Sequence, residues 1–451
     1  MKKLIQTIRN ISKIKELSDR ILFTLGMILI YRLGSFIIIP GIDSKALLDA
    51  HQGNDGGLVG LISTFTGGAF SRASIFALGI MPYISASIVM QLLGVAVPQI
   101  QKIQKDGESG RKKIQTYTKF LTIVITLMQA PAYLASYAGR GISNNDFLTF
   151  QLPAISVIVA STMFLMWLGD KITDKGLGNG VSLLIMVGIV ARFPEAISEE
   201  FLRGTTEAGG GRFLMFMIEL VVWFFIIALT IMLIQGVRKI PLQYAKQMAV
   251  GAINQSGARQ YIPIKVNIAG VMPIIFAQAI MFVPQTLLSM DFVDKEGILG
   301  TVFLKLSEPQ GFWYNFADAT MIILFTFFYT AMVINPRQWA DDFKKQGAFV
   351  PGIKPGADTA DYIDNILSKI TFPGSLFLAA IAVLPAFAMM AGIKTAFAYF
   401  FGGTSLLIMV GVIIDTLQQI ESHLLMSHYD GLMESGKLRG RSTGVNSPAG
   451  V

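Results

Sequence analysis

The sequence predicts an all-α membrane protein whose chain crosses the bilayer ten times. Of its 451 residues, 53% are hydrophobic and only 15% are charged, whereas a soluble domain has about 25% charged residues. Ten apolar stretches alternate with polar segments, and every second polar segment is rich in lysine and arginine. These three observations predict the class of the protein, the number of its crossings and its orientation.

The distribution of basic residues predicts the orientation. Six polar segments hold 27 of the 37 lysines and arginines, the five segments between them hold nine, and Arg32 lies within the first apolar stretch. The six rich segments are 1–20, 98–119, 171–180, 236–265, 336–370 and 421–451. Because loops rich in lysine and arginine stay on the cytoplasmic side of a membrane, we expect both termini in the cytoplasm.

The apolar stretches have the length of transmembrane helices. A bilayer core of about 30 Å needs about 20 helical residues, and a helix is expected because lipid offers no partner to free backbone groups. The expected spans are 21–39, 75–97, 119–138, 153–170, 180–197, 214–235, 268–289, 317–335, 371–391 and 398–420. Ten spans divide into two halves of five, which permits an inverted repeat with a site between the halves.

The charged residues and motifs of the sequence argue against two functional classes of membrane protein. An ion-driven carrier usually needs an ionisable group inside the membrane, but Arg32, Asp170, Glu219 and Asp415 all lie near span ends, where side chains reach the interface. A metal-dependent intramembrane protease needs H-E-x-x-H, which is absent, and a serine protease needs a base beside its serine. An aspartyl protease would have to use Asp170 and Asp415, which lie in no recognisable motif.

Cofactor chemistry is not expected either. The chain has no cysteine, its three histidines lie in polar segments, and no G-x-x-x-x-G-K-[ST] motif occurs. We therefore expect neither a metal site, nor a cofactor, nor an enzymatic activity.

Residues 58–72 are too short and too polar to cross a bilayer. Glycines lie before and within this segment, at 56, 57, 67 and 68, and give the backbone conformational freedom. We interpret it as a short re-entrant or outer-side helix able to move, with an ordinary outer loop as the alternative.

Six long motifs resemble the SecY family, the channel subunits of the bacterial protein-translocation complex. They are GGAFSRASIFALGIMPYISASIVMQLL, KDGESGRKKI, MFLMWLGDKITDKGLGNGVSLLI, KVNIAGVMPIIFA, INPRQWADDFKKQGAFVPGIKPG and FGGTSLLI, and the resemblance covers about residues 15–440. It implies two five-helix halves, 1–197 and 198–451, around an hourglass pore in a bacterial cell membrane. Such a channel passes unfolded polypeptides across the membrane and releases transmembrane segments laterally into lipid.

The resemblance also assigns residues to the channel. The pore ring is expected at Ile80, Ile84, Val181, Ile185, Ile275 and Ile408, where Val181 replaces an expected isoleucine. The segment 58–72 corresponds to a plug that includes Gly67, Gly68, Phe70, Ser71 and Arg72. The resemblance also implies a lateral gate, with spans two and three on one side and spans seven and eight on the other. Its polar cross-links are expected to come from Ser85, Gln129 and Asn267. An aliphatic ring offers water and ions no hydrogen bonds, so a narrow ring dewets.

The basic segments 236–265 and 336–370 resemble docking loops for the ribosome and for the SecA motor ATPase. The docking residues are expected to be Arg238, Lys239, Lys246, Arg337, Lys344, Lys345 and Lys354. Lys354 departs from the family pattern G-I-R-P-G, and lysine lacks the two-pronged hydrogen bonding of arginine. The implied partners are SecE, SecG, SecA, the ribosome, signal peptides, nascent chains and membrane lipids.

Overall fold

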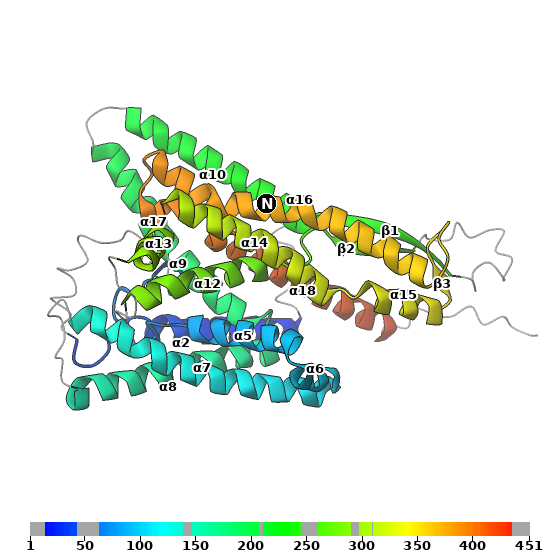
Figure 1. The fold of residues 1–451 in the computed structure, drawn as a ribbon, viewed down its shortest axis with the longest axis horizontal. Helices are drawn as coiled ribbons and strands as arrows, with labels where there is room; N and C mark the ends of the chain where they lie inside the picture. Colours follow the sequence, from blue (N-terminus) through cyan, green and yellow to red (C-terminus); the bar gives the residue numbers. More distant parts are fainter. Residues whose placement is uncertain are drawn as a thin grey trace, which may run out of the picture.

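The computed structural model describes residues 14–42, 63–138, 147–206, 211–244, 260–289, 297–308 and 310–434. The described chain is an elongated bundle of helices with one small sheet at one end (Figure 1). Each of the ten predicted spans coincides with a helix. These helices are α2 (Lys15–Gly34), α5 (Met81–Ala96), α7 (Gly107–Ala138), α8 (Leu152–Lys175), α9 (Gly180–Thr206), α10 (Gly211–Gln235), α12 (Met272–Ser289), α14 (Phe312–Val333), α16 (Ala357–Met390) and α18 (Gly403–Glu434).

Length and hydropathy alone identify fewer spans than ten. Within the described ranges, seven helices are long and apolar enough to cross a membrane, and α5 with α6 (Pro98–Lys105) would be an eighth, bent by 105°. The first turns of α2 are charged, which keeps this helix below the limit. The count of ten therefore depends on the agreement between the predicted spans and the observed helices.

The second span begins later than predicted. We expected it from residue 75, but residues 66–80 form consecutive turns, and regular helix begins at Met81 with Pro82 in its first turn. Positive φ angles at Gly67, Gly68 and Gly79 interrupt a right-handed helix in this stretch. The turns pack beside the end of α2, where Ile38 forms an isolated bridge with Ser74.

The basic segments 236–265 and 336–370 form one folded unit, where we had predicted only loops. Strand β1 (Val237–Tyr244) pairs antiparallel with β2 (Gln260–Lys265) and with β3 (Ala348–Phe349), in the order β2-β1-β3. Strand β3 follows α15 (Pro336–Lys345), and α16 begins 14 residues before the predicted span. We call β1, β2, β3, α15 and the first turns of α16 the sheet unit.

An apolar cluster of its own holds the sheet unit together. Ile240 and Leu242 point inward from alternate positions of β1 and pack with Ile363 and Leu367 of α16. Trp339 of α15 packs against the same cluster. The sheet unit is therefore a folded platform, which fixes the positions of the basic side chains that it carries.

Figure 1 shows α2, α5, α7 and α8 together at one side of the bundle and α10, α14 and α16 at the other. Helices α9 and α18 pack against each other between these groups. The remaining short elements are η1 (Phe147–Gln151), α13 (Ile298–Leu306) and α17 (Thr395–Ala398). The predicted boundary of the two halves, after residue 197, falls within α9, and the division into halves remains a prediction.

Replacing Ile240 by alanine should loosen the sheet unit. Ile240 is 1% exposed, and truncating a buried isoleucine costs about 2–5 kcal/mol. We expect faster hydrogen–deuterium exchange across β1 and β2, with little change in α7 or α8. Val237→Ala on the same strand, where the side chain is 42% exposed, is the matched control, and equal effects of the two changes would contradict the proposed core.

Candidate functional site

The six aliphatic residues of the predicted pore ring lie in one apolar cluster. Ile80, Ile185 and Ile408 are buried in it, and Ile84, Val181 and Ile275 are partly buried against it. They come from α5 and its N-terminal cap, from α9, from α12 and from α18, which are distant in sequence. Ile80 with Ile84, and Val181 with Ile185, are each four residues apart, and this spacing places both members on one face of a helix.

The described part of the predicted plug, residues 63–72, packs against α9. A Cβ atom at Gly188 of α9 would lie 2.5 Å from the carbonyl oxygen of Phe65, and one at Gly67 would lie 3.0 Å from the carbonyl oxygen of Gly188. Only glycine at both positions permits this approach of the two backbones. Gly67 also has a φ of 63°, which other residues rarely adopt. Residues 58–62 lie outside the described part of the chain.

Helix α7 and hydroxyl groups hold the same segment from other directions. The hydroxyl of Tyr133 donates to the carbonyl oxygen of Phe70 at 2.9 Å, and the two rings meet edge to face with centroids 4.8 Å apart. Within the segment, the hydroxyls of Ser63 and Ser71 are hydrogen-bonded to each other. In this structure the segment is therefore packed in place; its predicted mobility remains a prediction.

Three arginines from three elements surround Gly67 and Gly68. Arg32 of α2 and Arg72 of the plug both donate to the carbonyl oxygen of Gly67, at 3.5 and 3.4 Å, and both lie over the ring of Phe36. A Cβ atom at Gly68 would lie 2.7 Å from Nη2 of Arg72 and 3.2 Å from Nε of Arg192. Like charges are thus held close together at the position of the predicted plug.

Arg72 is in an unfavourable environment for a charged side chain. Burial, and next the charge of Arg32, lower the pKa of the Arg72 guanidinium, while Glu195 on α9 acts in the opposite direction. Nη1 of Arg72 and Nε of Arg192 are buried and have no hydrogen-bond partner among the described residues. The segment therefore combines close backbone packing with a group of neighbouring like charges.

The three predicted gate residues do not bond to one another. The hydroxyl of Ser85 donates to the carbonyl oxygen of Met81 in its own helix, and the amide of Asn267 donates to the carbonyl oxygen of Gly270. Gln129 is half-buried on α7. The expectation that these side chains form polar cross-links of a lateral gate remains a prediction. The contact of α5 with α12 is far smaller than that of α5 with α7.

The described basic docking residues all lie on the sheet unit and are exposed. Arg238 and Lys239 lie on β1, Arg337, Lys344 and Lys345 on α15, and Lys354 in the turn before α16. Lys246 lies outside the described residues. Two segments that are separated by about seventy residues therefore bring their basic side chains to one folded unit, because β1 pairs with β3.

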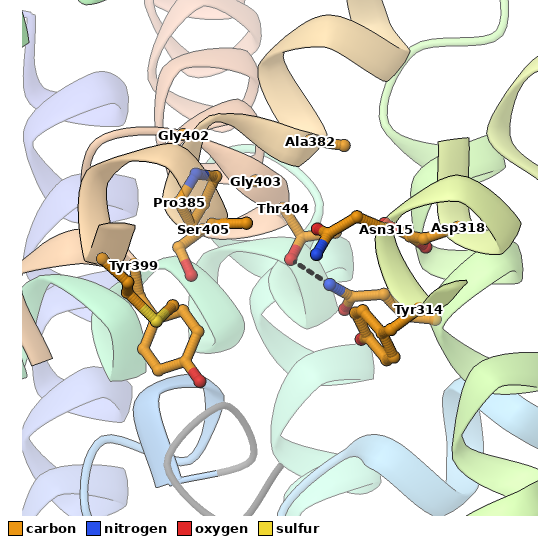
Figure 2. A pocket seen from close by; sticks show the side chains of 13 residues that line it. Tyr314, Asn315, Asp318, Ala382, Pro385, Tyr399, Gly402, Gly403, Thr404 and Ser405 are labelled. Carbon is orange, nitrogen blue, oxygen red and sulfur yellow. Dashed lines mark hydrogen bonds between the residues drawn. The ribbon is translucent and has the colours of Figure 1, made fainter. Parts of the chain in front are cut away.

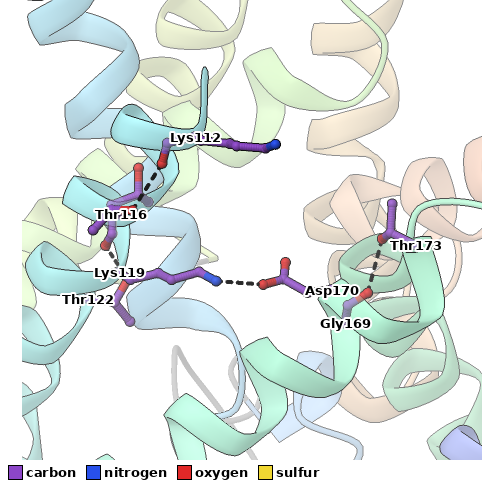
Figure 3. Close-up of polar contacts among 8 residues, drawn as sticks. Lys112, Thr116, Lys119, Thr122, Gly169, Asp170 and Thr173 are labelled. Atoms are coloured by element: carbon purple, nitrogen blue, oxygen red, sulfur yellow. Dashed lines mark hydrogen bonds and ion pairs between the residues drawn. The ribbon is translucent and has the colours of Figure 1, made fainter. Parts of the chain in front are cut away.

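The carboxylates considered for a protease have structural surroundings. Asp170 on α8 forms an ion pair with Lys119 on α7, with 2.8 Å between Oδ2 and Nζ (Figure 3). Asp415 is exposed on α18. A third aspartate, Asp318 near the start of α14, was not predicted as a site residue and is only 6% exposed. Its position at the edge of the predicted span 317–335 was the one feature of the sequence that could have indicated a buried carboxyl group.

Comparisons with known proteins agree with this geometry. The family model described as SecY matches residues 74–417. The chain belongs to the SecY family. The protein translocase subunit SecY of Aquifex aeolicus (strain VF5) is 42% identical over 424 residues, which cover 92% of this chain and 96% of the relative. That of Escherichia coli (strain K12) is 42% identical over 437 residues, covering 94% and 96%.

The fold is also that of solved channels. The structure of a protein conducting channel matches with a TM-score of 0.64 and 18% identity, over 90% of this chain and 92% of that one. Sec61 in the canine ribosome-channel complex from the endoplasmic reticulum matches with a TM-score of 0.63, also at 18% identity, over the same shares. The predicted fold class, a polytopic helical membrane protein of the SecY type, is therefore confirmed.

Gly188→Ala should displace the plug segment. The added methyl group would lie 2.5 Å from a backbone oxygen that belongs to the segment, so the segment has to shift. We expect higher ion conductance of the purified channel in a planar bilayer. Gly26→Ala on α2 is the control, since a Cβ there meets nothing within 4 Å and alanine favours helix by about 0.5–1 kcal/mol. Identical conductance of both variants would contradict the hypothesis that the packed plug segment blocks ion flow.

Proposed function

We propose that this chain is the channel-forming subunit of a protein translocase. Unfolded polypeptides cross the membrane through it, and hydrophobic segments leave it sideways into lipid. The observation that carries this proposal is the convergence of six aliphatic side chains from distant helices on one apolar cluster, beside a segment packed against α9. Family membership supports it, because the relatives are named as protein translocase subunits.

The aliphatic ring is the constriction that seals the proposed channel against water and ions. It offers no hydrogen bonds to water or ions, so it excludes them when narrow, and it binds a passing chain only weakly. The segment at 58–72 is the plug: it blocks the path when the channel is idle and moves when a substrate enters. The crowded arginines around Gly67 favour its release once packing is lost.

In this proposal the two halves, 1–197 and 198–451, stay connected on one side and separate on the other. On one side α9 is tied to the chain after α16: Glu200 accepts from the backbone N–H of Lys394 at 3.2 Å, and Arg203 donates to the carbonyl oxygen of Gly392 at 3.3 Å. On the other side α5 and α12 touch only slightly. A weak seam between α5 and α12 is the proposed lateral gate, next to Ser85, Gln129 and Asn267.

Energy and substrates reach the proposed channel from partners. The sheet unit, with its exposed basic side chains, is the proposed docking platform for the ribosome and for SecA on the cytoplasmic side, where both termini also lie. Sec61 and the yeast Ssh1 complex were solved with ribosomes, which supports a ribosome partner. SecE and SecG are the proposed companion subunits in a bacterial cell membrane. We propose no catalytic site and no cofactor for this chain.

A cross-linking experiment tests the path of the substrate. A photoreactive residue at 185 or 275 should label a stalled secretory chain during translocation, because both positions belong to the proposed ring. The control is position 224 on α10, where Phe224 is 71% exposed on the bundle surface. Labelling at 224 but not at 185 or 275 would place the substrate outside the ring.

Ile408→Asn should loosen the ring. The side chain is 3% exposed within the apolar cluster, and a polar amide there lets water enter a constriction that otherwise stays dry. We expect increased ion leak through the channel and export of substrates with weakened signal sequences. Ile413→Asn, one turn further along α18 and 42% exposed, adds the same group outside the cluster and should change neither property.

Charge reversal at Arg238 and Lys239 should weaken ribosome binding. Both side chains are exposed on β1, and contacts of basic residues with RNA phosphates weaken steeply with salt. The double change to glutamate should raise the dissociation constant about tenfold and reduce its salt dependence, as measured by co-sedimentation. Lys305→Glu on α13 is the control, and equal losses from both variants would contradict a specific platform.

A further inference from the structure

A small, partly open cavity with several polar groups in its walls lies between helices at the end opposite the sheet unit. Its volume is about 30 Å³, and its walls come from α12, α14, α16 and the start of α18. Figure 2 shows the polar side chains that surround it, which include Tyr314, Asp318, Tyr399 and Thr404. A volume of this size exceeds the 10–15 Å³ needed for one water-sized occupant.

Asp318 is the charged group of this cavity. The residue is 6% exposed, and its Oδ1 atom is buried without a hydrogen-bond partner in the described parts of the chain. No lysine, arginine or histidine is among the residues that line the cavity. An ionised carboxylate that is buried without a counter-charge is very costly. Asp318 is therefore stable here either as the neutral acid or as a carboxylate with a cation beside it.

The other groups around the cavity are uncharged and rich in oxygen. Gln278 donates through Nε2 to the hydroxyl of Thr404 at 2.6 Å, which leaves its carbonyl oxygen as an acceptor. Ser405 and Tyr314 contribute hydroxyl oxygens. The first turn of α18 brings a helix N-terminus near, but this end carries only about half a positive charge and balances the carboxylate only in part.

We propose that this cavity binds a monovalent cation, Na⁺, with Asp318 as its charged ligand. Hard cations in proteins take oxygen ligands, and sites for calcium usually combine several carboxylates. One carboxylate among neutral oxygens balances a single positive charge. Carboxylate, amide and hydroxyl oxygens from α12, α14 and α18 would then surround one ion.

The ion would link α14 to two of the helices that carry the pore ring, α12 and α18, so this role rests on the proposed function. Thr404 lies one helical turn before Ile408 on α18, and Gln278 lies three residues after Ile275 on α12. The bound cation therefore holds α12, α14 and α18 in register directly beside two ring positions. Loss of the ion should loosen this part of the ring.

Thermal unfolding of the purified chain in detergent tests binding without any translocation. Tm is measured in NaCl, in KCl and in choline chloride at equal ionic strength. We expect NaCl to raise Tm by about 2–4 °C over choline chloride, saturably, with a smaller effect of KCl. A Tm that is equal in all three salts would overturn the site, and it would leave the proposed channel function untouched.

Asp318→Asn separates this site from a general salt effect. The neutral amide removes the charge that needs a cation, so the variant should fold, lose the Na⁺-dependent rise in Tm and be as stable in choline chloride as in NaCl. Asp170→Asn is the matched control, because Asp170 is paired with Lys119, and it should keep the rise. Retention of the rise in Asp318→Asn would overturn the assignment.

Binding of ²²Na⁺ gives a second readout that does not depend on stability. The parent chain and Asp170→Asn should bind about one equivalent, and Asp318→Asn should bind none. Full binding of ²²Na⁺ by Asp318→Asn, or no binding by the parent chain, would contradict the proposed site. If the site is confirmed but Ile408→Asn does not change ion leak, the ion site stands and the channel assignment fails.

Discussion

The packing of α9 against α18 is the contact on which the rest of the molecule depends. Both helices contribute to the largest apolar cluster, together with α2, α8 and α10. Phe193 of α9 stacks on Trp223 of α10, and the indole of Trp223 donates to the carbonyl oxygen of Phe400 just before α18. Near the other end, the N–H of Gly178 donates to the side chain of Gln419 at 2.8 Å. This seam keeps α9 and α18 in fixed register, and with them Val181, Ile185 and Ile408.

The contact of α5 with α12 across the bundle is weaker. A weak contact allows two helices to separate. A channel that admits large polypeptides has to separate helices at a seam with little buried area, while another seam stays closed. The slight contact of α5 with α12 satisfies the first condition, and the contacts of α9 with α10, α17 and α18 satisfy the second. In lipid, single interhelical hydrogen bonds contribute only about 0.6 kcal/mol on average, so packing area decides which seam opens.

Charged groups inside the bundle lie at the two places where we propose that a segment moves or that an ion binds. Arg32, Arg72 and Arg192 gather around the two glycines of the plug, and Asp318 lines an oxygen-rich cavity. Ionisable side chains inside a membrane are costly and mark functional sites by default. The ion pair of Lys119 with Asp170 is different, because its partners are part-exposed and neutralise each other. Burial without a partner, more than charge itself, separates the functional groups from the structural ones.

The sequence by itself determined the class, the ten helices and the exposed basic segments. These depend on local properties: a bilayer requires about 20 apolar residues for each span, and 21–39 or 214–235 satisfy this without reference to any other part of the chain. The positions of Ile80 and Ile408 in a ring came from a resemblance to a family, because a single isoleucine in an apolar helix carries no signal of its own.

Tertiary structure alone decided where those elements meet. The start of α5 moved from residue 75 to Met81 because the preceding turns pack beside α2 and adopt positive φ angles at their glycines. The strands at 237–244 and 348–349 were not predicted, because their pairing joins residues about one hundred positions apart. Asp318 was overlooked for the same reason: its lack of a partner is a property of its neighbours on α12 and α18. Interactions between distant segments decide such features, and no local pattern records them.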